Sequence, residues 1–164
     1  MSPSIERSSF DRITEHIWLG SRVASLDHYH LVRAQGVSAC VDMKSEGPDT
    51  WAFDAFLWLP TDDHEPPEVP LLRMGLDFLR RCEELSFAVY VTCMAGVGRS
   101  PTLVLAHLLR TRFRGLAPEE ALGFLCSKRP LVSLTERQYA AAIAAAATEG
   151  ATEGPWPRSI LSAR

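Results

Sequence analysis

The sequence has few of the features that mark membrane, secreted or disulfide-linked proteins. No apolar run approaches the ~20 residues that a membrane-spanning helix requires. The four cysteines, Cys40, Cys82, Cys93 and Cys126, show no CxxC or other paired spacing, and no secretory signal opens the chain. These absences favour a cytoplasmic protein with free thiols.

Strong charge and metal-ligand patterns are also missing. The formal net charge of -3 gives no reason to expect binding to nucleic acid or to an anionic membrane. His16, His28 and His30 lack the spacing of metal ligands, so neither a metal nor another cofactor is expected. With 164 residues, 46% of them hydrophobic and 23% charged, the chain fits one globular domain.

Predicted strands alternate with predicted helices along the chain. Short apolar runs predict strands at 13–20, 37–43, 55–60 and 87–91. Helical spacing of apolar residues, with start and stop signals, predicts helices at 25–36, 71–85, 101–113, 118–129 and 135–147. The start and stop signals include a stop at Gly36, a first-turn Pro118 and a capping box of Thr135 and Gln138. This alternation favours an α/β fold with a mostly parallel central sheet flanked by helices, and 87–91 as a central strand.

The stretch "VYVTCMAGVGRSPT", residues 89–102, places a cysteine between a strand end and a helix start. In α/β sheets, ligands bind beyond the carboxyl ends of the strands, which is where Cys93 falls. The next residues supply successive backbone N–H groups, and Gly96 and Gly98 allow a tight turn. Ser100 is a favoured N-cap residue, and the proline after it suits the first helical position.

Such a loop combines an anion site with a nucleophile. Amides that converge on a helix N-terminus bind a tetrahedral oxyanion such as phosphate, and the planar fork of Arg99 holds two of its oxygens. The same helix terminus and cation stabilise a thiolate, whereas an ordinary free cysteine is mostly protonated at neutral pH. One loop therefore activates Cys93 and binds the group that it attacks.

A phosphate transfer also needs a proton for the departing oxygen. Asp62 and Asp63 lie in a proline-rich loop, 61–70, after the predicted strand 55–60. A parallel neighbouring strand brings this loop to the same sheet edge as Cys93. One of the two aspartates can act as general acid and then as base toward water, although a turn-forming role explains either one alone equally well.

The motif "CMAGVGRS" resembles the Cys-x5-Arg-Ser/Thr signature of the protein-tyrosine-phosphatase superfamily. The "ITEHIWLGS" opening, the "LPTDD" loop and the helix after "GRSPT" resemble the dual-specificity phosphatases within it. The resemblance extends from about Phe10 to Ala147. It implies a catalytic domain of the dual-specificity phosphatase fold over 10–147, between an N-terminal tail, 1–9, and a C-terminal tail, 148–164.

The resemblance also implies roles for single residues. Cys93 would form a cysteinyl-phosphate, Arg99 would clamp the phosphate, and Ser100 would assist the departure of the thiolate. Asp63 rather than Asp62 would be the acid, because of where the family places its aspartate after the "LP" strand end. The backbone of the loop, Met94, Ala95, Gly96, Val97, Gly98 and Arg99, would bind the phosphate.

One departure from the family pattern bears on activity. Family members usually carry histidine immediately before the cysteine, where this chain has Thr92. The difference implies a slower enzyme and leaves a catalytically weak phosphoresidue-binding pseudophosphatase as an alternative. A rhodanese-type sulfurtransferase is a further alternative, but its loop is less similar in length and it has no use for an Asp-bearing loop.

The loop gives some information about the substrate. Met94, Ala95 and Val97 are uncharged, whereas relatives that act on phosphoinositides often carry lysine or extra arginine at these positions. A phosphoprotein is therefore the favoured partner and substrate, with no membrane partner. The choice between phosphotyrosine and phosphoserine or phosphothreonine stays open, as does the oligomeric state, for which a monomer is favoured.

Several other polar residues have simpler structural explanations. His64 is expected to be a loop residue and His107 a histidine packed in the core. Gln138 can orient a hydrolytic water, although its capping role already explains it. Asp42 can brace the loop from behind, but a strand-end hydrogen bond is the simpler account. The remaining cysteines are expected to be small buried apolar residues.

Overall fold

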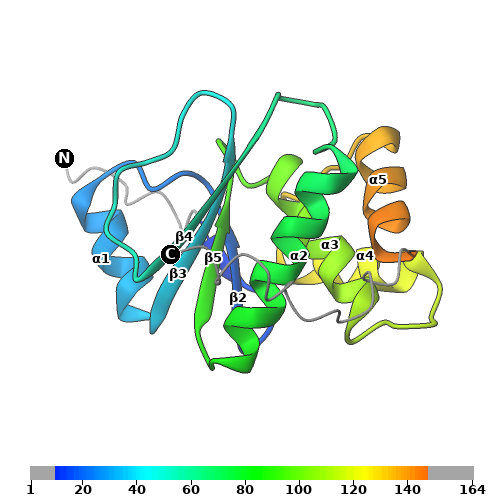
Figure 1. Cartoon of the computed structure of the whole chain (residues 1–164), viewed down its shortest axis with the longest axis horizontal. Helices are drawn as coiled ribbons and strands as arrows, with labels where there is room; N and C mark the ends of the chain where they lie inside the picture. Colours follow the sequence, from blue (N-terminus) through cyan, green and yellow to red (C-terminus); the bar gives the residue numbers. More distant parts are fainter. Residues whose placement is uncertain (1–9, 148–164) are drawn as a thin grey trace, which may run out of the picture.

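A computed structural model describes residues 10–147, which form a five-stranded sheet with helices on both faces (Figure 1). The strands lie in the order β1-β2-β5-β3-β4. β1 pairs antiparallel with β2, and all other neighbours pair in parallel. The bounds are Phe10–Arg12 (β1), Ile17–Gly20 (β2), Val37–Lys44 (β3), Ala55–Thr61 (β4) and Ala88–Thr92 (β5). The predicted α/β fold is confirmed, and so is β5 as a central parallel strand.

The helices divide unequally between the two faces of the sheet. In Figure 1, α1 lies on one face and the other four helices cover the opposite face. The helices are α1 (Leu26–Ala34), α2 (Val69–Glu84), α3 (Arg99–Arg110), α4 (Pro118–Lys128) and α5 (Glu136–Ala147). The main apolar core combines strand residues such as Leu19 and Val91 with helix residues such as Leu105, and a smaller cluster around Tyr90 lies apart from it.

The parallel strands all end at one edge of the sheet, and polar residues follow each end. β5 ends directly before Cys93, β4 ends two residues before Asp63, and β3 ends two residues before Glu46. Because parallel strands present their carboxyl ends together, these three segments meet although they are far apart in sequence.

The prediction of one strand over 13–20 is wrong in its first half. β2 begins only at Ile17, and residues before it form a turn in which the Ile13 N–H donates to the Ile17 carbonyl at 2.8 Å. The Thr14 hydroxyl oxygen accepts hydrogen bonds from the N–H groups of His16 and Ile17, which gives the backbone a local alternative to pairing. The turn reverses the chain, so that Phe10–Arg12 forms the hairpin strand β1.

The predicted helices are present with small shifts at their ends. Gly36, with φ of 82°, follows the end of α1, and Pro118 occupies the first turn of α4. The capping box of α5 is also confirmed, because the Thr135 N–H donates to Gln138 Oε1 at 3.0 Å while the Gln138 N–H donates to Thr135 Oγ1 at 3.1 Å. The predicted tails, 1–9 and 148–164, lie outside the described residues.

Two negative observations concern the described part of the chain. Each helix within 10–147 is too short or too polar to cross a bilayer. Over the same range, no three His, Cys, Asp or Glu side chains are grouped so that they could hold a metal ion.

Candidate active site

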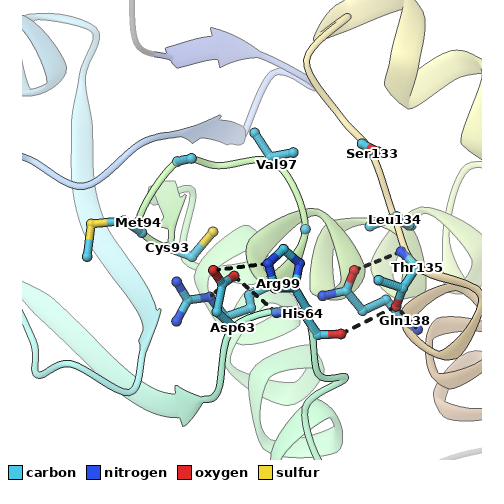
Figure 2. Close-up of a pocket in the computed structure, with 12 residues that line it drawn as sticks. Asp63, His64, Cys93, Met94, Val97, Arg99, Ser133, Leu134, Thr135 and Gln138 are labelled. Atoms are coloured by element: carbon cyan, nitrogen blue, oxygen red, sulfur yellow. Dashed lines mark hydrogen bonds and ion pairs between the residues drawn. The ribbon is translucent and has the colours of Figure 1, made fainter.

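A pocket of about 350 Å³ opens at the carboxyl edge of the sheet (Figure 2). Its floor is the loop after β5, and its walls come from the segment after β4 and from the start of α5. The lining residues are Asp63, His64, Cys93, Met94, Ala95, Val97, Gly98, Arg99, Ser133, Leu134, Thr135 and Gln138. The structure therefore brings the predicted loop and one of the two predicted aspartates together around one space.

Cys93 lies at the base of the pocket, only 2% exposed, directly after the buried strand β5. The Ser100 hydroxyl donates a hydrogen bond to its sulfur at 3.2 Å. The prediction that Ser100 caps the helix is wrong, because α3 begins at Arg99 and Gly98 occupies the N-cap position without a side-chain cap bond. Placed inside the first turn, the Ser100 hydroxyl faces the thiol rather than a backbone N–H.

Every backbone carbonyl from Cys93 to Gly98 accepts a hydrogen bond from outside the loop. In chain order, the donors are Thr92 Oγ1 (3.0 Å), Arg22 N (3.1 Å), Arg129 Nη2 (3.0 Å), Arg129 Nε (2.8 Å), Ser133 N (2.9 Å) and Thr102 N (3.1 Å). In a planar trans peptide, the carbonyl and the next N–H point in opposite directions. Carbonyls that are bonded outward therefore direct the N–H groups of residues 94–99 inward, as an anion site requires.

Gly96 gives this loop its close contact with β2. Its φ of 66° lies in the left-handed region, and a Cβ on Gly96 would lie 2.4 Å from the carbonyl carbon and oxygen of Gly20. Only glycine fits a position with both constraints. The end of β2 thus supports the loop from behind.

The Arg99 guanidinium is buried and held from one side. Its Nη1 donates to Glu46 Oε2 at 2.9 Å and to the Thr61 carbonyl at 3.0 Å, and its Nη2 lies 3.4 Å from Glu46 Oε1. The Nε atom is buried without a hydrogen-bond partner and lies 3.6 Å from Asp63 Oδ1. This leaves an oriented donor for an oxyanion in the pocket.

Glu46 comes from the segment between β3 and β4, which several contacts hold in place. The Trp51 indole N–H donates to the Val23 carbonyl at 2.6 Å, and the Trp58 indole N–H donates to the Lys44 carbonyl at 2.8 Å. The hydrogen bond from Arg99 holds the pKa of Glu46 below its usual range. Glu46 is therefore a fixed negative partner that orients the guanidinium.

Asp42 lies beneath this segment rather than against the phosphate loop. Its carboxylate accepts hydrogen bonds from the Lys44 N–H at 3.0 Å and from the Asp49 N–H at 3.0 Å. The Lys44 ammonium pairs with both Asp42 and Asp49 in the buried interior. The expected strand-end hydrogen bond is thus observed, and Asp42 supports the Glu46 segment.

The two predicted aspartates face different spaces. Asp63 lines the pocket with Cys93, and its carboxylate is directed toward the loop in Figure 2. Asp62 instead lines a separate hollow with Pro66 and Arg137. His64 is an exposed loop residue, as expected, with φ of 62° and its ring 3.6 Å from Asp63 Oδ2. Of the two neighbours, only Asp63, which the family resemblance favoured, lines the pocket that contains Cys93.

Gln138 joins two walls of the pocket. Besides its capping contacts, its Nε2 donates to the Glu65 carbonyl at 3.2 Å, which ties α5 to the segment that carries Asp63. The side chain is 1% exposed, and its amide would lie 3.1 Å from a Cβ on Gly98. Gln138 therefore has a place in the pocket as well as in the helix cap.

Comparison with known proteins identifies the family. The model of the "Dual specificity phosphatase, catalytic domain" family matches residues 17–145. The chain belongs to this family. Dual-specificity phosphatases are thus the proteins with which its site is to be compared.

Similar phosphatases come from several organisms. The chain is 26% identical over 125 residues to tyrosine-protein phosphatase vhp-1 of Caenorhabditis elegans. The aligned region covers 74% of this chain and 19% of that protein. The chain is 32% identical over 142 residues to phosphatidylglycerophosphate phosphatase PTPMT1 of Arabidopsis thaliana. Here the aligned region covers 82% of this chain and 41% of that protein. The solved structure of human DUSP28 matches with a TM-score of 0.71 and 25% identity, over 84% of this chain and 93% of that chain.

The first curated phosphatases that match are much longer than this chain. The matched region spans only about a fifth of their length, between 18% and 20%. The shared part is therefore the catalytic domain.

Sequence reasoning missed three side chains that support this candidate site. Glu46 contacts Arg99, Arg129 contacts the loop, and Asp11 contacts Arg129, all from segments remote in sequence. Arg129 follows a helix end, where a basic residue has an ordinary explanation, and Glu46 lies in a Gly-Pro loop. Neither position carries a signal that points to the phosphate loop.

Proposed function

We propose that this chain is a cysteine-dependent protein phosphatase that hydrolyses phosphomonoesters through a cysteinyl-phosphate intermediate. The observation that carries the proposal is the loop of inward N–H groups around Cys93, held by carbonyls that are all bonded outward. A tetrahedral dianion fits this loop, and the sulfur at its base faces the phosphorus atom.

In the first step, the Cys93 thiolate attacks phosphorus, and the bond from phosphorus to the substrate oxygen breaks. The inward N–H groups and the unpartnered Arg99 Nε stabilise the charge on the transferring oxygens. Asp63, in its protonated form, gives its proton to the departing oxygen, a role that its place in the pocket supports.

In the second step, water attacks the phosphorus of the cysteinyl-phosphate, and the Asp63 carboxylate takes a proton from that water. The bond between sulfur and phosphorus breaks, and the thiolate leaves with the electron pair. The Ser100 hydroxyl, 3.2 Å from the sulfur, stabilises the leaving thiolate by hydrogen bonding. Phosphate and the starting enzyme result.

Phosphorylated side chains of proteins are the favoured substrates. The Met94, Ala95 and Val97 side chains at the pocket are uncharged, which disfavours a polyanionic lipid headgroup. The free thiols of all four cysteines suit a reducing compartment such as the cytoplasm. A monomer that meets its phosphoprotein substrate transiently accords with a pocket whose lining residues all come from this one chain.

A lipid phosphomonoester is the second candidate substrate. The observation that favours it is the 32% identity to a phosphatidylglycerophosphate phosphatase, compared with 26% and 28% for the first curated protein phosphatases. Phosphatidylglycerophosphate carries one terminal phosphomonoester, so it does not need the extra cations of a phosphoinositide reader.

The decisive experiment measures phosphate release from an aryl phosphate by the reduced protein and by a Cys93→Ser control. Turnover that the control lacks supports the phosphatase. Phosphate or phosphopeptide binding without turnover would instead establish the pseudophosphatase, and thiosulfate-to-cyanide transfer without phosphatase activity would establish the sulfurtransferase.

The substrate class is decided by matched kcat/KM values. Phosphotyrosyl and phosphothreonyl peptides of one sequence are compared with phosphatidylglycerophosphate in mixed detergent micelles. A preference for the lipid over both peptides would overturn the protein substrate while leaving the phosphatase intact.

A further inference from the structure

Arg129 is a buried cation that contacts the outer side of the phosphate loop. It directly follows α4, and its side chain is 1% exposed. Its Nε donates to the Gly96 carbonyl at 2.8 Å, and its Nη2 donates to the Ala95 carbonyl at 3.0 Å. One rigid guanidinium therefore fixes two consecutive peptide planes of the loop.

Asp11 fixes the remaining edge of this guanidinium. Arg129 Nη1 donates to Asp11 Oδ2 at 2.7 Å, and the Asp11 side chain is 34% exposed. Asp11 belongs to β1, which pairs with β2, and it lies before residue 17, where the family match begins. Because a guanidinium is planar, fixing all three of its edges fixes its orientation.

The contacts with Arg129 determine which way the loop amides face. The Ala95 carbonyl shares its peptide plane with the Gly96 N–H, and the Gly96 carbonyl shares its plane with the Val97 N–H. Without Arg129, either plane is free to rotate and to present a carbonyl oxygen to the bound anion. The cation also polarises both peptide groups, which strengthens their N–H groups as donors.

We propose that the Asp11–Arg129 ion pair orients the backbone N–H groups of the phosphate site. Through Asp11, β1 then contributes to phosphate binding. Arg129 acts through the Gly96 and Val97 N–H groups, and Asp11 acts through Arg129. This inference rests on the proposed phosphatase function, but binding of an oxyanion tests it without turnover.

The test measures two quantities for Arg129→Met, Asp11→Asn and the double variant. One is kcat/KM for an aryl phosphate. The other is the orthophosphate concentration that half-protects Cys93 from iodoacetate, followed by peptide mass spectrometry. Leu79→Ala is the control for lost stability, because Leu79 is a fully buried core residue outside the site. Asp54→Asn is the control for lost charge, because Asp54 pairs with Arg33 on the surface.

Complete removal of one oxyanion donor costs about 10²–10³-fold in kcat. Arg129→Met misaligns the Gly96 and Val97 N–H groups without removing them, so we expect a smaller loss, of roughly 10–100-fold in kcat/KM. The protecting phosphate concentration is expected to rise by a similar factor. Asp11→Asn is expected to show a smaller change in the same direction. The double variant is expected to match Arg129→Met, because the two residues act as one unit. Both controls are expected to stay within about twofold at a temperature where each variant is folded.

Specific outcomes would overturn the inference. If folded Arg129→Met protects Cys93 at the same phosphate concentration as the wild type, the ion pair has only a structural role. If Arg129→Met does not fold, Asp11→Asn decides, and unchanged kcat/KM and protection would reject the proposal. A wild type that binds phosphate without hydrolysis would remove the proposed function but leave the protection test valid.

Discussion

The Ser100 hydroxyl and the Cys93 sulfur lie 3.2 Å apart, with the hydroxyl as donor. Both side chains are buried, so water does not compete strongly for this contact. A hydrogen bond to sulfur matters most when the sulfur carries negative charge, as it does when the thiolate leaves in the proposed second step.

Ser100→Ala is expected to slow the hydrolysis of the cysteinyl-phosphate more than its formation. A hydrogen bond to a charged group contributes about 1.5–3 kcal/mol, which corresponds to a slowing of roughly 10–100-fold. Rapid-mixing experiments with an aryl phosphate would show a burst of released phenol followed by a slow steady state. Ser127→Ala is the control, because the Ser127 hydroxyl donates only to the Phe124 carbonyl within α4. Equal slowing of the burst and of the steady state would contradict this role.

Asp63→Asn is expected to slow the release of poor leaving groups far more than that of good ones. A missing general acid matters little when the departing oxygen needs no proton. The measurement is the dependence of kcat/KM on the leaving-group pKa across a series of aryl phosphates, which is expected to become steeper. Asp62→Asn, which changes a residue in the neighbouring hollow, is expected to keep the wild-type slope. A steeper slope for Asp62→Asn instead would assign the acid to that residue.

Gly96→Ala and Gly123→Ala are expected to act in opposite directions. At Gly96, a Cβ meets the Gly20 backbone at 2.4 Å in the left-handed region, so the loop must distort and activity is expected to fall by at least tenfold. At Gly123, inside α4, a Cβ has open space, and the change is expected to stabilise the protein by roughly 0.5–1 kcal/mol. Urea unfolding and kcat/KM for both variants check this. Full activity of Gly96→Ala would mean that the loop tolerates another path.

The Glu83–His107 pair predicts a pH-dependent contribution to stability. His107 Nε2 lies 2.9 Å from Glu83 Oε1, and this hydrogen bond holds the pKa of Glu83 below its ordinary value. A lowered folded-state pKa means that the contribution is present above the unfolded-state pKa, about 4.3 for glutamate, and is lost as the pH falls through the folded-state pKa. Glu83→Gln is thus expected to cost about 1 kcal/mol at pH 7. The difference from wild type, measured by urea unfolding, is expected to shrink below about pH 4. A constant difference from pH 7 to pH 3 would show that ionisation of Glu83 is not involved.

Local sequence was sufficient for the parts of the site that are contiguous. Cys93, Arg99 and Ser100 lie within one loop and the helix after it, so strand, glycine and helix signals together predicted the loop that lines the pocket with Cys93 and Arg99. The same local signals placed Asp63 at the right edge of the sheet, because β4 and β5 are both parallel to β3. Thr92 also has an observed contact, since its hydroxyl donates to the Cys93 carbonyl at 3.0 Å.

Tertiary contacts decided what local signals did not. Ser100 has a high N-cap preference, but the helix begins at Arg99, and the Ser100 hydroxyl donates to the Cys93 sulfur instead. Ile13 and Thr14 have strand-forming β-branched side chains, yet the Thr14 hydroxyl stabilises a turn there. Arg129 and Glu46 support the site only because the fold brings distant segments together, which a single sequence does not reveal.

The Trp51 indole donates to the Val23 carbonyl and the Trp58 indole donates to the Lys44 carbonyl. Each of these two contacts joins a residue before Glu46 in the chain to a residue after it. Glu46 in turn accepts a hydrogen bond from Arg99, the cation that is proposed to bind the phosphate. Tryptophan emission responds to changes in polarity and hydrogen bonding around the ring. We therefore expect phosphate binding to change the intrinsic tryptophan fluorescence, which can be measured without an attached dye.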